Sequence, residues 1–264
     1  MLALKKQLKH CKDVILLGAI AIVTGIIIGA IETLFGKGLS EIAAIRTNHV
    51  YQLTPFLPLA GLLIVFVYSK IGKNSSKGMS LIFSAASNED EEIPKRLVPL
   101  LMASTWLTHL FGGSAGREGA AVQIGGTVAH SIEKAIGRRF NIKNSSKILI
   151  ITGMAAGFAG MFQTPIAAIF FAMEVLTAGV IEYGALFPCI VASFTANYTS
   201  HFLGLEKLSV DLHSSLQFKT DIILKIALLG IVSGIIGGVF AYLLKFSKNF
   251  FSRCISNPMF KVII

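Results

Sequence analysis

The residues best suited to chemistry lie in the stretch 112–120, which reads GGSAGREGA. It separates two apolar runs, Leu97–Phe111 and Ala120–Ile132, and each is shorter than the roughly 20 residues of a membrane-spanning helix. An arginine and a glutamate are costly in hydrocarbon, so their presence at such a break indicates a functional site. Glycines let the backbone approach a ligand closely, and a helix beginning at Gly119 would offer free N–H groups to an anion. The stretch therefore predicts an anion site in a membrane transporter, with Glu118 beside it.

The composition is that of a polytopic membrane protein. Of the 264 residues, 53% are apolar and 14% are charged, and the mean hydropathy is +0.71. The net charge of +10 would suit nucleic acid, but the basic residues lie between hydrophobic segments, as in cytoplasmic loops that follow the positive-inside rule. We therefore expect no nucleic-acid partner. Cys11, Cys189 and Cys254 have neither metal-ligand nor disulfide spacing, so we predict no metal and no cofactor.

Charged loops predict how the segments around the site are oriented. Four lysines precede the first apolar segment, Val14–Phe35, and place residues 1–13 in the cytoplasm of a multi-pass protein of the cell membrane. Gly36–Gln52 is predicted to be an outside loop, and Leu53–Tyr68 then returns to the inside. Basic loops flank Leu97–Ile132 on both sides, although it holds about one and a half spans of apolar residues. Two short helices that enter and leave from the cytoplasmic side would satisfy both facts, with the break near mid-depth.

A second break is predicted further along the chain. Ile148–Val180 is too long for one straight span, and Gln163-Thr164-Pro165 interrupts it. Proline disfavours the helical conformation at the residue before it, so two helices are expected here. Ala185–Leu205 would then cross to the outside, and Ile222–Leu244 would cross back.

One internal repeat is visible. Ile22–Gly29 reads IVTGIIIG, and Ile231–Gly238 reads IVSGIIGG. An odd number of crossings separates the copies, so the second would enter from the opposite side, as in the inverted repeats of transporters. The alternative is that any two membrane helices rich in glycine and isoleucine look alike. If the repeat is real, residues 14–206 form the first copy, and residues 222–264 form the start of an incomplete second copy.

Two motifs, in this order, resemble those of the CLC family of chloride channels and anion/proton antiporters. GGSAGREGAAVQIGG at Gly112–Gly126 is similar to the family's glutamate-gate motif, and GMAAGFAGMFQTPIAAIFFAME at Gly153–Glu174 is similar to the helix pair that follows it. The resemblance runs from about Val14 to the end of the chain and covers only the family's N-terminal half. It implies an all-α polytopic membrane fold of two inverted repeats with broken, re-entrant helices, the second repeat incomplete here. It also implies a homodimer in which each subunit has its own pore.

The resemblance also implies roles for single residues. Glu118 would be the gate and proton acceptor, a buried carboxylate that occupies an anion site and leaves it when protonated or displaced. The alternative is that Glu118 only pairs with Arg117. The anion would be held by two segments whose residues are Gly116, Arg117, Gly119 and Ala120, and Gly78, Met79 and Ser80.

Three departures from the family pattern bear on the transported ion. Met79 stands where chloride-type members carry the serine that coordinates the ion, and Ala120 replaces the proline of the usual GREGP. Val175 stands where chloride/proton antiporters carry an inner proton-relay glutamate, with Glu174 one position earlier. Together these departures resemble the fluoride-exporting branch, which exchanges fluoride for protons without that serine or that glutamate. Fluoride/proton antiport is therefore predicted, with a chloride channel or a chloride/proton antiporter of the same family as alternatives.

Functions of other classes have less support. The glycines of 112–119 could suggest a nucleotide loop, but no strand and no Gly-Lys-Ser/Thr accompanies them. An intramembrane hydrolase would need a nucleophile and a base, and Ser114 lacks a nucleophile-elbow setting next to His109. We therefore expect no enzyme. The strongest competitor is a non-transporting fragment or a half-subunit that needs a partner chain, because the resemblance covers only half of the family's length.

Overall fold

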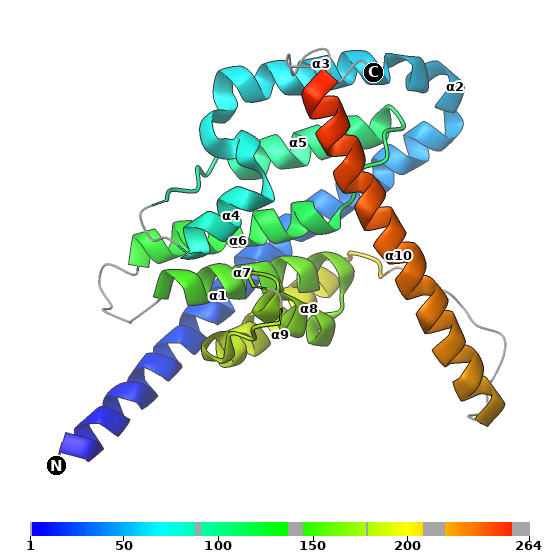
Figure 1. The fold of residues 1–264 in the computed structure, drawn as a ribbon. Coiled ribbons are helices and arrows are strands. Elements are labelled where there is room, and N and C mark those ends of the chain that lie inside the picture. The colour runs from blue at the N-terminus through cyan, green and yellow to red at the C-terminus, as the bar shows by residue number, and fades with distance from the viewer. Residues whose placement is uncertain (1, 88–90, 137–144, 178, 208–219, 255–264) are drawn as a thin grey trace. The chain divides into compact units, whose positions relative to one another are not determined.

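A computed structural model describes residues 2–87, 91–136, 145–177, 179–207 and 220–254, and every regular element in these ranges is a helix (Figure 1). The chain divides into two compact units, Met1–Lys207 (unit 1) and Leu208–Ile264 (unit 2), which we describe separately. In chain order the α-helices are α1 (Leu2–Asn48), α2 (Val50–Leu53), α3 (Leu57–Val67), α4 (Met79–Ser87), α5 (Leu97–Leu110), α6 (Glu118–Ile136), α7 (Ser145–Phe162), α8 (Pro165–Glu174), α9 (Leu186–Phe202) and α10 (Thr220–Cys254).

Four helical stretches are long and apolar enough to cross a membrane. They are Lys12–Asn48, Val50–Lys77, Ser145–Phe162 and Ile222–Phe251. The helices Leu97–Leu110 and Pro165–Glu174 are apolar but shorter. The protein is therefore an all-α polytopic membrane protein that contains helices too short to span the bilayer, as the sequence predicted.

The long first helix corrects one prediction. Gly36–Gln52 is not an outside loop, because α1 continues without a break to Asn48. Its glycines serve close packing instead: a Cβ placed on Gly36 would lie 2.6 Å from Leu205 Cδ1, and one on Gly38 would lie 2.6 Å from Trp106. A glycine inside a helix costs only about 1 kcal/mol relative to alanine, so these contacts suffice to keep the segment helical.

The first predicted helix pair is present. α5 has 14 residues, about 21 Å at 1.5 Å per residue, which is shorter than the hydrocarbon thickness. The chain reverses after α5, and α6 returns toward the side from which α5 came (Figure 1). α6 begins at Glu118, one residue earlier than predicted.

Glycines bring α6 and α7 into very close contact. A Cβ on Gly125 of α6 would lie 2.0 Å from the carbonyl oxygen of Gly153, and one on Gly157 of α7 would lie 2.2 Å from the carbonyl oxygen of Ala121. No side chain fits at such distances, so glycine is required at these crossing points. We call this contact the α6–α7 seam. It fixes the position of the helix that begins at Glu118.

The second predicted break is also present. α7 ends at Phe162 and α8 begins at Pro165. Gln163 between them has φ +54°, and its side-chain Nε2 donates a hydrogen bond to the carbonyl oxygen of Leu205. The long-range hydrogen bond compensates for a backbone conformation that L-residues rarely adopt.

α9 packs against the glycine face of α1. A Cβ on Gly25 or Gly29 would lie 2.7 Å from the carbonyl oxygen of Ala192 or Ala196, respectively. In unit 2, a Cβ on Gly234 of α10, the position that matches Gly25, would meet nothing within 4 Å. The inverted repeat remains a prediction, and α10 extends beyond the predicted Ile222–Leu244 at both ends.

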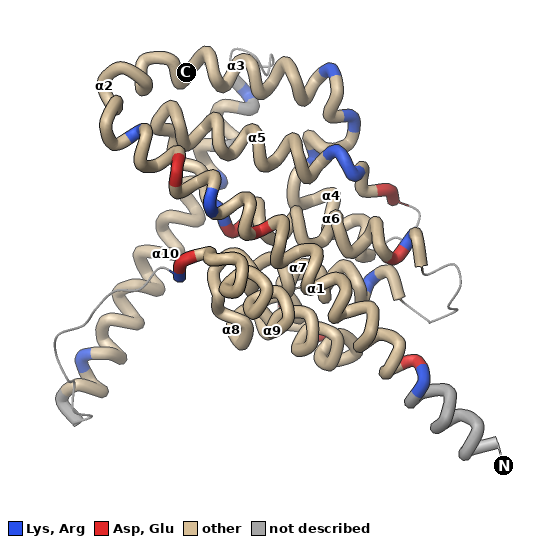
Figure 2. Tube along the Cα trace, turned by 180° about the vertical axis from the view of Figure 1, so that it is seen from behind, with Lys and Arg blue, Asp and Glu red and all other residues tan. Residues whose placement is uncertain are grey.

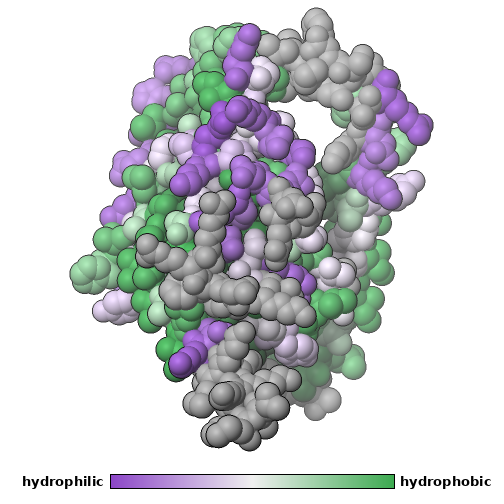
Figure 3. Space-filling view, turned by 90° about the vertical axis from the view of Figure 1, so that its left-hand side faces the viewer, coloured by the Kyte–Doolittle hydropathy of each residue, from purple (hydrophilic) through white to green (hydrophobic). Residues whose placement is uncertain are grey.

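Besides the charges on the C-terminal half of α1 and at the break before α6, unit 1 has a group of charged residues at one end. They occupy the connections from α3 to α4 and from α4 to α5 and the last turn of α6, while the middles of the helices are uncharged for long stretches (Figure 2). Figure 3 faces this end and shows hydrophilic residues across it. The N-terminal end of α1 points to the same side (Figure 1). Several residues of the predicted cytoplasmic loops, Glu89, Asp90, Arg138, Arg139 and Lys143, lie outside the described residues.

Candidate functional site

The break between α5 and α6 is built by glycine. Gly112 has φ +83°, a conformation that glycine adopts without strain. The amide of Gly113 donates a 2.8 Å hydrogen bond to the carbonyl oxygen of Thr108 and so closes the last turn of α5. Residues 113–116 then run without helix to Glu118, the first residue of α6. The break is thus an ordered turn rather than a kinked helix.

Glu118 is placed at the mouth of this break. Its side chain is exposed within unit 1, and burial of this carboxyl stays a prediction. Its neighbours explain the exposure, because Gly116 and Gly119 contribute no side chain that could cover it and Ser114 is itself exposed. The carboxylate turns back over the break: a Cβ on Gly116 would lie 2.7 Å from Glu118 Oε2. Gly116 therefore provides the space that this carboxylate occupies.

Arg117 does not neutralise Glu118 in this structure. The ion pairs among the described residues are Lys77–Glu91, Lys134–Glu92 and Lys147–Glu182, and none of them includes Arg117 or Glu118. The Arg117 side chain is exposed as well. The carboxylate at the start of α6 therefore faces the helix N-terminus without a cation paired to it.

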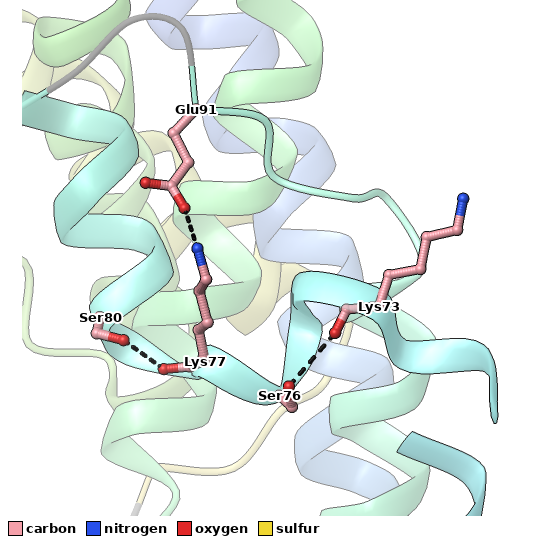
Figure 4. A network of polar contacts seen from close by, with 5 residues as sticks. All are labelled: Lys73, Ser76, Lys77, Ser80 and Glu91. Atoms are coloured by element: carbon pink, nitrogen blue, oxygen red, sulfur yellow. Dashed lines mark hydrogen bonds and ion pairs between the residues drawn. The ribbon is translucent and has the colours of Figure 1, made fainter. Parts of the chain in front are cut away.

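The second predicted segment lies at the start of α4. Gly78 has φ +59° and joins a short 3-10 helix, Lys73–Lys77, to α4. Ser80 Oγ donates a 2.6 Å hydrogen bond to the carbonyl oxygen of Lys77, and Lys77 Nζ pairs with Glu91 at 2.6 Å (Figure 4). Met79 packs against a buried cluster that includes Leu81 and Ile82. The Ser80 hydroxyl and the Met79 side chain are thus engaged elsewhere, and only backbone N–H groups remain to contact an anion.

Gln123 brings the two segments together. A Cβ on Gly78 would lie 3.9 Å from Gln123 Oε1, and a Cβ on Gly119 would lie 3.9 Å from Gln123 Nε2. Gln123 is 8% exposed; its Nε2 donates a 3.0 Å hydrogen bond to the carbonyl oxygen of Gly119, and its Oε1 has no partner. The starts of α4 and α6, at Met79 and Glu118, are distant in sequence but meet at one amide side chain.

Sequence reasoning missed Gln123, although a signal was present. It lies inside the glutamate-gate motif, four residues after Gly119 on α6. Residues four apart share a helix face, so its side chain had to project toward the start of the helix. The sequence has no such signal that Gln123 would also lie near Gly78, at the start of α4.

Ala120 contributes packing and a backbone donor. Its side chain is 5% exposed and belongs to a cluster with Phe35, Leu39 and Met102. An alanine has the N–H that a proline at this position would lack, so the first turn of α6 presents one more donor. Further along the chain, Val175 packs against another buried cluster and Glu174 is exposed at the end of α8.

Two cavities lie away from these segments. One of about 140 Å³ is lined mostly by apolar residues of α3 and α5, together with Tyr68 and Ser104. The other, of about 360 Å³, lies at the charged end and includes Lys95, His130 and Lys134. The described residues contain no group of three or more His, Cys, Asp or Glu side chains placed to hold a metal ion.

Comparisons with known proteins show the family of this chain. The family model described as voltage gated chloride channel matches residues 60–264. A chloride/fluoride channel protein of Pseudomonas syringae pv. tomato is 32% identical over 223 residues, which are 84% of this chain and 48% of that protein. The chain thus spans about half the length of this relative.

Solved structures of two antiporters share the fold. A CLC-type fluoride/proton antiporter superposes with a TM-score of 0.86 and 44% identity, covering 94% of this chain and 62% of that one. A slow cyanobacterial chloride/proton antiporter superposes with a TM-score of 0.78 at 18% identity, covering 94% of this chain and 61% of that one, and this likeness shows the fold alone.

Proposed function

Because this chain belongs to the voltage gated chloride channel family, we propose that it transports anions across a membrane by fluoride/proton antiport, with Glu118 as the gate. A single observation carries the proposal: the starts of α4 and α6 meet at Gln123. Each helix start presents free N–H groups and the positive end of the helix dipole. Two such ends directed at one place favour a small anion there.

The exposed carboxylate of Glu118 supports the gating role. A carboxylate is itself an oxygen anion, so the positive start of α6 can hold either Glu118 or a halide ion. The space above Gly116 already receives its Oε2. Protonation would remove the charge of Glu118, and the side chain would then leave the site open for the transported ion.

The side chains at the start of α4 support fluoride over chloride. Neither Met79 nor the Ser80 hydroxyl is free to coordinate an ion, because one packs in the core and the other is bonded to the Lys77 carbonyl oxygen. The site therefore lacks the serine hydroxyl of chloride-type members. One relative is named a chloride/fluoride channel protein, and the solved structure at 44% identity is that of a fluoride/proton antiporter. A chloride channel or a chloride/proton antiporter is the alternative within the family.

A complete pore needs more than unit 1. Glu118 is exposed there, and the glycine face of α10 has no neighbour among the described residues of its own unit. We infer that a second set of helices, from another part of the same protein or from a partner chain, covers the site. We also propose a homodimer in the cell membrane with the charged end of unit 1 in the cytoplasm, because basic loops stay on that side.

Ion efflux from liposomes tests this function. Liposomes that contain the purified chain are loaded with equal fluoride and chloride, and ion-selective electrodes follow both ions while a pH electrode follows proton uptake. We expect fluoride release coupled to proton uptake. Glu118→Gln should release fluoride without proton uptake, while Glu41→Gln, on an exposed part of α1, should behave like the parent chain.

Each contrary result removes a different part of the proposal. Release of chloride alone would overturn the choice of ion. Coupled exchange that persists in Glu118→Gln would remove the gate. If a chain shown to be folded and inserted releases neither ion, this chain acts only with the helices of a partner.

A further inference from the structure

Glu32 of α1 is the only buried acid among the described Asp and Glu side chains, with 0% of its surface exposed. Both of its carboxyl oxygens are buried and lack a hydrogen-bond partner. Buried polar groups are normally hydrogen-bonded, and an ionisable group inside a membrane protein indicates a function. Neither the anion site nor the helix breaks account for this residue.

Small residues enclose Glu32 at the junction of three helices. A Cβ on Gly160 of α7 would lie 3.4 Å from Glu32 Cβ, so α7 approaches the stem of the side chain directly. One turn earlier on α1, Gly29 faces the Ala196 carbonyl of α9, and one turn later Gly36 faces Met161 and Leu205. The glutamate therefore projects from the one face of α1 where both α7 and α9 come closest.

No charged side chain compensates Glu32 from these helices. On α1 the nearest cation in sequence is Lys37, which is exposed, and on α9 His201 is exposed. Lys147, the charged residue of α7, is bonded to Glu182 at the other end of that helix. α6 contributes Glu118, which is exposed, and no cation in its first three turns. An unpaired carboxylate in such surroundings is strongly disfavoured, so this site holds the neutral acid.

The packing connects Glu32 to the gate. Ile31 and Phe35 lie on either side of Glu32 along α1. Both belong to a cluster with Ala120 and Ala121 of α6. Those alanines occupy the turn that begins at Glu118. The part of α1 around Glu32 thus packs against the first turn of α6, while Val175 stands at the position where the resemblance places an inner proton-relay glutamate.

We propose that Glu32 is a second proton-binding carboxyl of this protein and acts as its inner proton relay. The proton leaves an oxygen of Glu32, which becomes a carboxylate for that moment, and water carries it to the carboxylate of Glu118. A second proton, taken up from water on the other side of Glu32, restores the neutral acid. This relay rests on the proposed proton-coupled transport, whereas proton binding at Glu32 does not.

Infrared spectroscopy of the full chain in liposomes tests proton binding without any transport. At pH 8 exposed carboxyls are ionised, so a protonated-carboxyl C=O band must come from a buried acid. We expect this band in the parent chain, in Glu118→Gln and in Glu41→Gln, and its loss in Glu32→Gln. The amide is neutral and of the same size, so it replaces the neutral acid with little disturbance. Absence of the band in the parent chain, or its persistence in Glu32→Gln, would overturn the proposal.

Flux measurements on the same liposomes test the relay. Glu32→Gln should still release fluoride, while its proton uptake per fluoride ion falls roughly a hundredfold, the low end of what a positioned proton-transfer group contributes. Glu32→Asp retains an acid and should restore part of the proton uptake. Unchanged coupling in Glu32→Gln would refute the relay. If the parent chain shows the infrared band but moves no protons with fluoride, the antiport proposal fails and proton binding at Glu32 stands.

Discussion

Glu118 and Glu32 are both glutamates, but the backbone around them differs. Glu118 is the first residue of α6, beside a break, and is exposed; Glu32 lies inside the unbroken α1 and is fully buried. A helix start has free N–H groups that stabilise negative charge, whereas the amides of a helix interior are already hydrogen-bonded. The comparison teaches that the backbone around an acid decides how well its negative charge is stabilised.

Both settings depend on glycine, for different reasons. At Gly112 the requirement is conformational, since φ is +83°. At Gly29, one turn before Glu32, and along the α6–α7 seam, the requirement is space for a neighbouring helix. The exposed acid is therefore held by a turn, and the buried acid is held by helix packing, so different substitutions should disturb each one.

The largest effect should come from filling the α6–α7 seam. Gly125→Val places a Cβ at 2.0 Å from the Gly153 carbonyl oxygen, and neither backbone can yield without separating the two helices. We expect a loss of at least about 3 kcal/mol and little folded protein in size-exclusion chromatography in detergent. Gly184→Ala is the matched control, because its Cβ would meet Glu182 Oε1 at an ordinary 3.5 Å. A Gly125→Val variant that elutes and melts like the parent chain would show that the seam is not needed.

Removing Glu32 and removing Glu118 should change the stability of the folded protein by different amounts. Glu32→Met takes away two buried, unpartnered oxygens at similar volume, so we expect the folded state to gain about 1–3 kcal/mol. Glu118→Gln changes an exposed group and should stay within about 0.5 kcal/mol. Thermal unfolding in detergent measures both. A destabilised Glu32→Met would mean that the buried carboxyl makes a stabilising contact, which contradicts its lack of partners.

A substitution where the starts of α4 and α6 meet should weaken ion binding more than it lowers the stability of the fold. Gln123→Leu removes the amide that contacts both starts, together with its hydrogen bond to the Gly119 carbonyl oxygen. We expect fluoride binding by calorimetry to weaken about tenfold, or about 1.4 kcal/mol. Thr127→Val, one turn further along α6, removes a hydroxyl that bonds only to the Gln123 carbonyl oxygen and should leave binding unchanged. Equal affinities for the parent chain and Gln123→Leu would exclude the amide from the site.

The smallest effect concerns the ion pair that tethers the start of α4. The hydrogen bond from Lys77, with the charge of that lysine, holds the pKa of Glu91 below its usual value of 4.5. A lowered pKa stabilises the folded state at neutral pH, and this stabilisation is lost as the pH falls from 4.5 through the lowered pKa of the folded state and Glu91 is protonated. The melting temperature of Glu91→Gln should therefore be slightly lower than that of the parent chain at pH 7 and equal to it at pH 3. A difference that persists at pH 3 would show that charge is not its cause.

Local features of the sequence predicted much of this arrangement. Gly112 and Pro165 mark the two helix breaks, and both breaks lie where these residues placed them. Local signals failed at Gly36–Gln52, which was predicted to be an outside loop after the first apolar segment, whereas α1 continues through it to Asn48. Glycine has the same local preference in both places, and the difference comes from Trp106 and Leu205, which lie far away in sequence.

The sequence by itself determined the membrane class, the family and the two helix breaks, because hydropathy, charge and backbone preference act over a few residues. Only the tertiary structure decided that Gln123 joins Gly78 to Gly119, that Glu118 is exposed in unit 1, and that Glu32 is buried without a partner. Each of these depends on which distant segments approach one another, and the spacing of residues along one helix carries no information about the helix packed against it.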